Sequence, residues 1–484
     1  MSTASKDGAS ANAQRLLWAG FMAILAAGVG FGVRGGILAD WGAQYGFTQT
    51  ELGQVTGFGL VGFGVVILIG ALLADVVGYG KLMIAAFVCH FVSAVLTLFA
   101  TAAFAKGGKD AAYACLKWGM ILFSVGNGLA EAVVNPLVAS LFPKNRTHYL
   151  NILHAGWPAG LVLGALASYF MVGKARWEIQ WALFLIPVVL YGLMCIGQHF
   201  PKSEASEKGV SFGEMLAEFA APLLLLLLFI HALVGYVELG TDSWISNITG
   251  NILASPQSGL LLFVYTSTLM FLLRFTAGPI VHKISPPGLL FVSACFGTVG
   301  LLLLGNAHGA VACVVAATVY GIGKTFLWPT MLGVVSDRFP KGGAITIGAV
   351  GGIGMLSAGF LGGPGIGYKQ DFYASRNLQQ TAPAVYEQYK APNQNQFLFF
   401  PAIFGLEGSK VAAVRAKSPA QRTADEAKVH DADLHGGRTA LKVTAAVPAV
   451  MAFLYLLIML YFRSKGGYKP VHIEGTGHSA REVA

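Results

Sequence analysis

Twelve stretches of this sequence are apolar and long enough to cross a lipid bilayer as helices. A crossing helix needs about 20 apolar residues, and it pairs its own backbone polar groups where no water can reach them. Charged residues are only 11% of the 484 positions and hydrophobic residues are 55%, too little charge to cover a soluble protein of this size. The sequence therefore predicts an all-α polytopic membrane protein and excludes a soluble enzyme, a disordered chain and a nucleic-acid-binding domain. The predicted spans are about 16–38, 52–74, 82–104, 112–141, 148–172, 179–198, 221–246, 258–281, 288–306, 309–334, 343–366 and 440–462.

The distribution of lysine and arginine predicts how the chain crosses the membrane. Basic residues collect in the connections that follow even-numbered spans, and cytoplasmic loops carry this excess. Both termini are therefore expected in the cytoplasm, with the chain in the plasma (inner) membrane. The expected parts are a cytoplasmic N-terminus 1–15, a first six-helix bundle 16–198, a cytoplasmic linker 199–220, a second bundle 221–463 with an external loop 367–439, and a cytoplasmic tail 464–484.

A faint internal repeat relates the two groups of six spans. The fourth span reads GLAEAVVNPLVASLFPKNR and the tenth reads GIGKTFLWPTMLGVVSDRFPKGG, each with a charged residue five positions before a proline and then FPK. Two pseudo-symmetric six-helix halves are typical of secondary transporters, whose binding site lies between the halves.

Two sets of motifs carry a resemblance to a known family. ALLADVVGYGK (71–81), with Asp75, Gly78 and Lys81, resembles the cytoplasmic gating motif of the major facilitator superfamily. AEAVVNPLV (130–138) and LNILHAGWPAG (150–160) resemble the fourth and fifth helices of its fucose:proton symporter branch. VELGTDSWISN, WPTM and IGAVGG resemble the seventh, tenth and eleventh helices of that branch. The resemblance implies a twelve-helix sugar permease that works by alternating access.

The sequence also departs from that branch. The first span has Arg34 and no carboxylate before Asp40, where the branch has an acidic residue. His154 and Trp157 stand where amide side chains are usual, and Lys324 stands where an asparagine is common. The site is therefore expected to be more basic and more aromatic, and substrate identity does not carry over.

Ionisable residues inside the spans are the candidates for function, because each costs about 2.5–3.5 kcal/mol to insert. They are Arg34, Glu131, Glu238, Arg274 and Lys324, with Asp242 nearer the outer end of its span. Desolvation favours the neutral form of a carboxyl group, so Glu131 and Glu238 are predicted to couple protons. The alternative is a structural Glu131 that is paired permanently with Arg34 or Lys324. Arg274 is expected to snorkel or to act in gating, because it lies near the end of its span.

The predicted substrate-binding residues are polar or aromatic side chains near these charges. Asn127, Glu131 and Asn135 recur every four residues on one helix face, and an indole can stack on a sugar ring. The set is Asn127, Asn135, His154, Trp157, Lys324, Trp328 and Arg34. The HDADLH sequence (430–435) is interpreted as part of a solvated helix, so no metal site is expected.

Taken together, the sequence predicts proton-coupled import of a monosaccharide or related polyol by a secondary transporter. A carrier of small organic anions, such as a sugar acid or carboxylate, and a transporter-like receptor are the alternatives. No enzymatic activity and no cofactor are expected. The partners are a small-molecule substrate, protons and the lipid bilayer but no nucleic acid, and the chain is expected to be a monomer.

Overall fold

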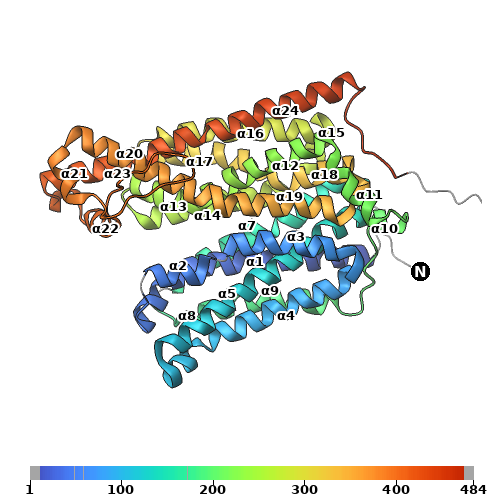
Figure 1. Ribbon diagram of the computed structural model, residues 1–484, viewed down its shortest axis with the longest axis horizontal. Coiled ribbons are helices and arrows are strands. Elements are labelled where there is room, and N and C mark those ends of the chain that lie inside the picture. The colour runs from blue at the N-terminus through green and yellow to red at the C-terminus, as the bar shows by residue number, and fades with distance from the viewer. Residues whose placement is uncertain (1–10, 48, 58, 172, 474–484) are drawn as a thin grey trace, which may run out of the picture.

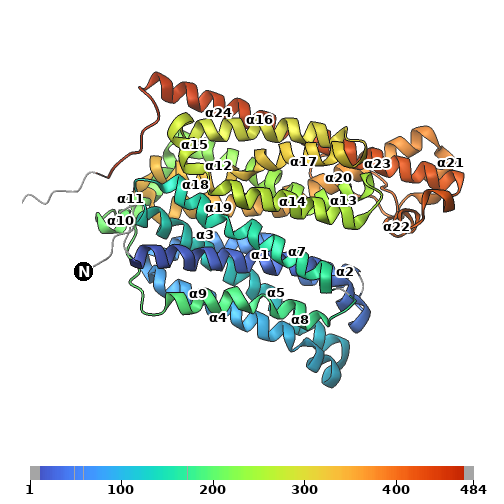
Figure 2. The ribbon, with the colours of Figure 1, turned by 180° about the vertical axis from the view of Figure 1, so that it is seen from behind.

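The computed structural model describes residues 11–47, 49–57, 59–171 and 173–473. Within them it has twelve helical segments long and apolar enough to span a membrane, so the predicted all-α polytopic fold is confirmed. The two halves lie side by side with their helices running along the long axis of the molecule (Figure 1). From the opposite side the same two groups are seen, joined at the end where α10 and α11 lie (Figure 2).

In the described part of the first half, nine α-helical segments build the six spans, and the fifth and sixth spans are each divided into two segments. They are α1 (Ala11–Tyr45), α2 (Gln49–Gly57), α3 (Gly59–Val77), α4 (Tyr79–Leu98), α5 (Ala100–Leu141), α6 (Arg146–His154), α7 (Gly156–Met171), α8 (Trp177–Ala182) and α9 (Leu185–Cys195). The linker forms α10 (Glu204–Glu207), α11 (Phe212–Ala217) and η1 (Glu218–Ala220). A capping box between Ser211 and Glu214 starts α11.

The second half is more interrupted, with two π-helical turns, η2 and η4, inside its spans. Its elements are α12 (Pro222–Gly235), η2 (Tyr236–Gly240), α13 (Thr241–Ile252), α14 (Pro256–Arg274), α15 (Ala277–Ile284), α16 (Pro286–Gly305), α17 (Gly309–Thr325), α18 (Leu327–Arg338), η3 (Pro340–Gly342), α19 (Gly343–Ser357), η4 (Ala358–Gly362), α20 (Gly363–Thr381), α21 (Pro383–Tyr389), α22 (Gly408–Ala416), η5 (Pro419–Gln421), α23 (Ala424–Thr444) and α24 (Ala446–Ser464).

Much of the predicted external loop 367–439 is helical. α20 continues to Thr381 and α23 begins at Ala424, and together with α21 and α22 they form a lobe that projects from one end of the molecule (Figure 1). The lobe has a hydrophobic core of its own, made by Leu378, Ala382, Val385, Tyr386, Val411, Val414, Val429 and Ala432. We call this end of the molecule the lobe end, and the opposite end, with the linker, the terminal end.

Glycines allow α1 and α7 to pack backbone against backbone. A Cβ placed on Gly28 would lie 2.4 Å from the Trp157 carbonyl oxygen, and one on Gly160 would lie 2.3 Å from the Leu25 carbonyl oxygen. Small residues permit such close approach between helices in membranes. This packing fixes the position of the aromatic and basic side chains that the two helices present to the interface between the halves.

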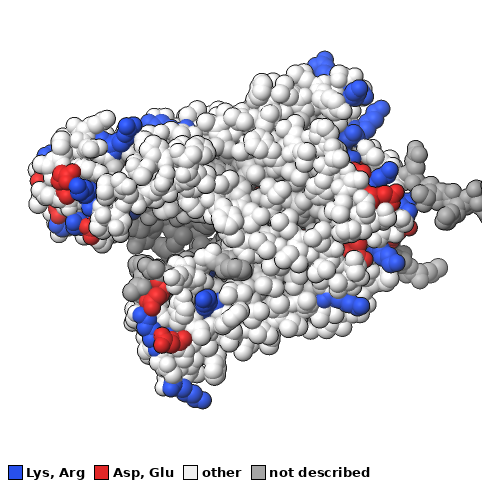
Figure 3. All heavy atoms as spheres, in the orientation of Figure 1, with Lys and Arg blue, Asp and Glu red and all other residues white. Residues whose placement is uncertain are grey.

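Charged side chains on the visible face gather toward the two ends of the molecule, and a broad band between them is almost free of charge (Figure 3). Such a band suits the hydrocarbon interior of a bilayer.

Candidate transport site

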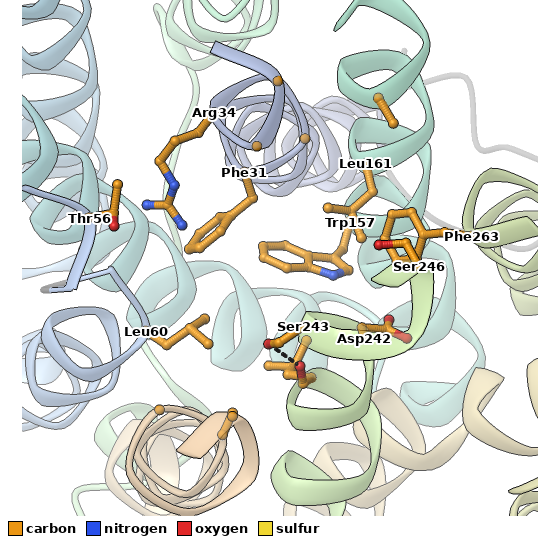
Figure 4. A pocket seen from close by; sticks show the side chains of 18 of the residues that line it. Phe31, Arg34, Thr56, Leu60, Trp157, Leu161, Asp242, Ser243, Ser246 and Phe263 are labelled. Atoms are coloured by element: carbon orange, nitrogen blue, oxygen red, sulfur yellow. Dashed lines mark hydrogen bonds between the residues drawn. The ribbon is translucent and has the colours of Figure 1, made fainter. Parts of the chain in front are cut away.

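A cavity of about 550 Å³ lies between the two halves, toward the lobe end. Helices α1, α3 and α7 of the first half and α13, α14 and η4 of the second half supply its walls. Figure 4 shows Arg34, Phe31 and Trp157 on one side of this space and Asp242 and Ser243 on another. The interface between the halves is where the sequence predicts the site, and we call this space the open cavity.

Arg34 and two aromatic rings form one wall of the open cavity. The Arg34 guanidinium carbon lies 4.4 Å from the centre of the Phe31 ring. The centres of the Phe31 and Trp157 rings are 5.3 Å apart, and the two rings are inclined at 55°. Of the predicted substrate-binding residues, Arg34 and Trp157 therefore line the cavity.

Lys324 lies behind the cavity rather than in its lining. Its side chain is fully buried, and its Nζ atom donates to both carboxylate oxygens of Asp242 at 2.5 and 2.7 Å. Asp242 itself lines the open cavity. The ammonium group thus neutralises a lining carboxylate. Lys324 is not among the described residues that line the cavity, and its role as a substrate ligand stays a prediction.

A second, almost filled space lies deeper between the halves. It has room for about 10 Å³, no more than a single water molecule needs, and we call it the inner chamber. Its lining residues are Glu131, His154, Trp157, Glu238, Leu239, Arg274, Trp328 and Met355. Trp157 and Leu239 line both spaces. These two side chains therefore separate the open cavity from the buried carboxyl groups.

Glu131 is held by an amide and lies close to an imidazole. Nδ2 of Asn135 donates to Oε2 of Glu131 at 2.6 Å. Nε2 of His154 lies 2.8 Å from Oδ1 of Asn135 and 3.9 Å from Oε2 of Glu131. Since a carbonyl oxygen only accepts, Nε2 is the protonated ring nitrogen in this arrangement. Within the described part of the chain, Glu131 forms no ion pair with Arg34 or Lys324, the partners that the alternative interpretation required.

Glu238 and Arg274 form a buried ion pair at 3.0 Å between Oε1 and Nη2. Nη1 of Arg274 donates to the backbone oxygen of His154 at 2.5 Å, so this guanidinium joins the second half of the molecule to the first. The expectation that Arg274 snorkels to a membrane surface is wrong, because its side chain is buried in this ion pair. Its expected role in gating stays a prediction. The chain continues into α15 after α14 ends at Arg274, and the side chain turns inward, where it is 1% exposed.

Trp328 and Asn127, like Asn135 and His154, are not among the described residues that line the open cavity. Trp328 is buried against His231, with ring centres 4.6 Å apart, and faces the inner chamber. Asn127 shares a helix with Glu131, but its Oδ1 lies 2.9 Å from Nε2 of His90 inside the first half. Asn127 does lie on the same helix as Glu131, yet α4, which carries His90, packs against the turn that carries Asn127.

The predicted gating motif lies at the terminal end, where the halves meet. Gly78 has φ +91° and precedes α4, a conformation that favours glycine. A Cβ built on Gly343, the first residue of α19, would lie 3.3 Å from Oδ2 of Asp75. A carboxylate beside a helix N-terminus is stabilised by the helix dipole. Lys81 is exposed.

Arg146, which the sequence does not single out, closes the same end. Its guanidinium pairs with Glu204 of the linker and lies 3.7 Å from Asp337 of α18, and it donates to the Ser336 carbonyl at 2.8 Å. Tyr468 of the tail donates to Asp337 at 3.1 Å. Arg146 and Asp337 stand next to the two repeated FPK segments, which are the one signal in the sequence that could have pointed to this contact.

The sequence model of one protein family, the Major Facilitator Superfamily, matches residues 20–363, well over half of the chain. The chain belongs to the Major Facilitator Superfamily. Membership makes it a membrane transporter rather than an enzyme, and it agrees with the two six-helix halves and the site between them.

Individual members of the superfamily are only distantly similar. The cis,cis-muconate transport protein of Acinetobacter baylyi is 24% identical over 177 residues, 36% of this chain and 40% of that protein. The structure of the E. coli fucose:proton symporter aligns with a TM-score of 0.62 at 14% identity, over 91% of this chain and 97% of the symporter. A proton:xylose symporter aligns with a TM-score of 0.66 at 14% identity, over 93% and 95%. At these identities the solved structures show the shared fold and do not specifically support the fucose branch.

Proposed function

We propose that this superfamily member imports a small polar solute together with protons by alternating access. The observation that carries the proposal is the buried Glu131 carboxyl group in the inner chamber, which Trp157 and Leu239 separate from the open cavity. Its hydrogen-bond partner is an amide, and no arginine or lysine within the described residues pairs with it. A carboxyl group without a fixed counter-charge can be neutral in one state and charged in another at low cost.

Glu238 and Arg274 supply the second part of the proposed cycle. Protonation of Glu238 would remove the charge that holds Arg274, and Arg274 also binds the His154 backbone across the interface between the halves. Loss of the ion pair would therefore loosen a contact that must break when the halves rock. His154 lines the inner chamber together with both carboxyl groups and is a candidate proton relay.

Two substrate classes remain candidates for the open cavity. The sequence favours a monosaccharide or polyol, and the Trp157 indole offers a stacking surface for either. A small organic anion is the second candidate, because the similar A. baylyi protein is a muconate transporter and Arg34 lines the cavity.

We further propose that the terminal end faces the cytoplasm of a plasma (inner) membrane and that the lobe lies outside. Ala412 in the lobe and Glu207 in the linker are both exposed. In a cysteine-free background, Ala412→Cys should react with an impermeant thiol reagent in intact cells and Glu207→Cys should not. The reverse labelling pattern would invert the topology.

Proton coupling is tested by uptake into proteoliposomes over a panel of labelled monosaccharides, polyols and carboxylates. Each solute is measured with an inside-alkaline pH gradient, without a gradient, and with a protonophore. The proposal predicts that the transported solute accumulates only under the gradient. Equal uptake in all three conditions would identify a uniporter instead.

A further inference from the structure

We propose that the transported solute is a small carboxylate with a flat apolar body, and that Arg34 binds its carboxylate group. The proposal rests on the proposed function, since it takes the open cavity as the place where the solute binds. It selects between the two substrate classes by the chemistry of the cavity wall.

Arg34 presents a positive charge that the described protein residues leave without a counter-charge. Its Nη1 atom is buried with no hydrogen-bond partner in the described ranges, and its guanidinium rests on the Phe31 ring. The carboxylate in the described lining, Asp242, is already held by both of its oxygens at Lys324. An unpaired charge inside a membrane protein is costly, so an anionic solute gains by supplying the missing partner. The guanidinium fork matches the two oxygens of a carboxylate.

The remaining wall suits a flat apolar group next to that charge. Phe31 lies directly beside Arg34, and Trp157 follows at 5.3 Å with an inclined ring (Figure 4). Aromatic rings favour such tilted or offset arrangements with a further planar group. The other large apolar side chains in the described lining are Leu60, Val61, Leu161, Leu239, Leu260 and Phe263.

The same wall offers little to the many hydroxyl groups of a sugar. No asparagine, glutamine or histidine occurs among the described lining residues. Three of the four hydroxyl side chains in the described lining already donate a hydrogen bond to a backbone carbonyl. Thr56 donates to Leu52, Ser168 to Val33 and Ser243 to Leu239. A polyol bound here would leave several of its own polar groups unpaired, which disfavours it.

The test measures binding to the purified full-length protein by isothermal titration, without a pH gradient. The probes are benzoate, cinnamate and sorbate, each compared with its neutral amide, and glucose. The variants are Arg34→Gln and Arg34→Lys, with Arg176→Gln as the control, because Arg176 is an arginine on the exterior whose side chain is 71% exposed. At least one carboxylate should bind the wild type, and its amide should bind about ten- to a hundredfold more weakly.

Arg34→Gln should lose the same factor for the carboxylate and little for the amide. Arg34→Lys should fall between, since lysine keeps the charge but not the fork, and Arg176→Gln should match the wild type. Binding of glucose in preference to all three carboxylates, equal binding of acid and amide, or no carboxylate binding at all would overturn the inference. If Arg34→Gln does not fold, the inference is still tested by the acid–amide comparison in the wild type and by the Arg34→Lys variant.

The two proposals fail separately. Arg34-dependent binding of a carboxylate whose uptake ignores the pH gradient would sink proton coupling and leave this inference standing. Gradient-driven uptake of a neutral sugar with no binding of carboxylates would refute this inference and leave proton coupling standing.

Discussion

Replacing Glu131 with glutamine removes the proposed proton carrier and changes the shape of the side chain very little. The glutamine oxygen can still accept the hydrogen bond that Asn135 now donates at 2.6 Å. A hydrogen bond to a charged group stabilises a protein by about 1.5–3 kcal/mol and a neutral one by about 0.5–1.5 kcal/mol. Glu131→Gln is therefore expected to cost about 1 kcal/mol of folding stability and to yield protein that can be purified.

The variant should keep exchange and lose accumulation. Substrate-for-substrate counterflow needs the alternating movement of a loaded carrier, which a permanently neutral side chain permits. At zero membrane potential, a pH difference of about one unit stores about 1.4 kcal/mol per proton. This is enough to concentrate a solute carried with one proton about tenfold. The wild type should approach that ratio in proteoliposomes, and Glu131→Gln should stop at equal concentrations inside and outside.

The control is Glu387→Gln, a charge-to-amide change at an exposed glutamate of the lobe that pairs with Lys390. It should leave both assays unchanged. Full gradient-driven accumulation by Glu131→Gln would refute the coupling role and move the test to Glu238. Loss of both counterflow and accumulation would show that Glu131 is needed for the movement itself.

Three further outcomes follow from the packing. Gly160→Ala should destabilise the purified protein by about 1–3 kcal/mol, because its Cβ would lie 2.3 Å from a carbonyl oxygen of α1. The control Gly35→Ala should leave the melting temperature nearly unchanged, because a Cβ there meets nothing within 4 Å. Arg146→Ala should open the terminal end. The second substitution Ala139→Cys, at a buried position beside Arg146, should then react faster with a permeant maleimide. An unchanged rate would show that other contacts hold this end closed. Trp157→Ala should weaken substrate affinity about a few-fold to tenfold in titration of well-folded protein, and unchanged affinity would reduce Trp157 to a packing role.

The sequence predicts the twelve spans well because hydropathy and helix length are local properties. It also finds the buried charges, since any ionisable residue in an apolar stretch stands out. It does not predict their partners, because Lys324 meets Asp242 across 82 positions of the chain and Arg274 meets Glu238 across 36. These pairings depend on how helices from one half are rotated and packed.

The errors have physical causes of the same kind. Arg274 looks terminal when only its own span is read, but the helix packing carries it into the inner chamber. A hydropathy window does not show the helices of the predicted loop 367–439 because they are polar, and the sequence indicates a helix there only at HDADLH (430–435). The capping box between Thr423 and Glu426 marks where that helix, α23, begins.

The central claim, that solute and proton cross together, is tested most directly with a pH electrode. Proteoliposomes without any imposed gradient are suspended in weakly buffered medium, and the substrate identified in the uptake panel is added outside. The account predicts that the medium becomes more alkaline as protons enter with the solute, and that Glu131→Gln abolishes this signal. Solute entry into wild-type vesicles with no change of external pH, or with acidification, would contradict it.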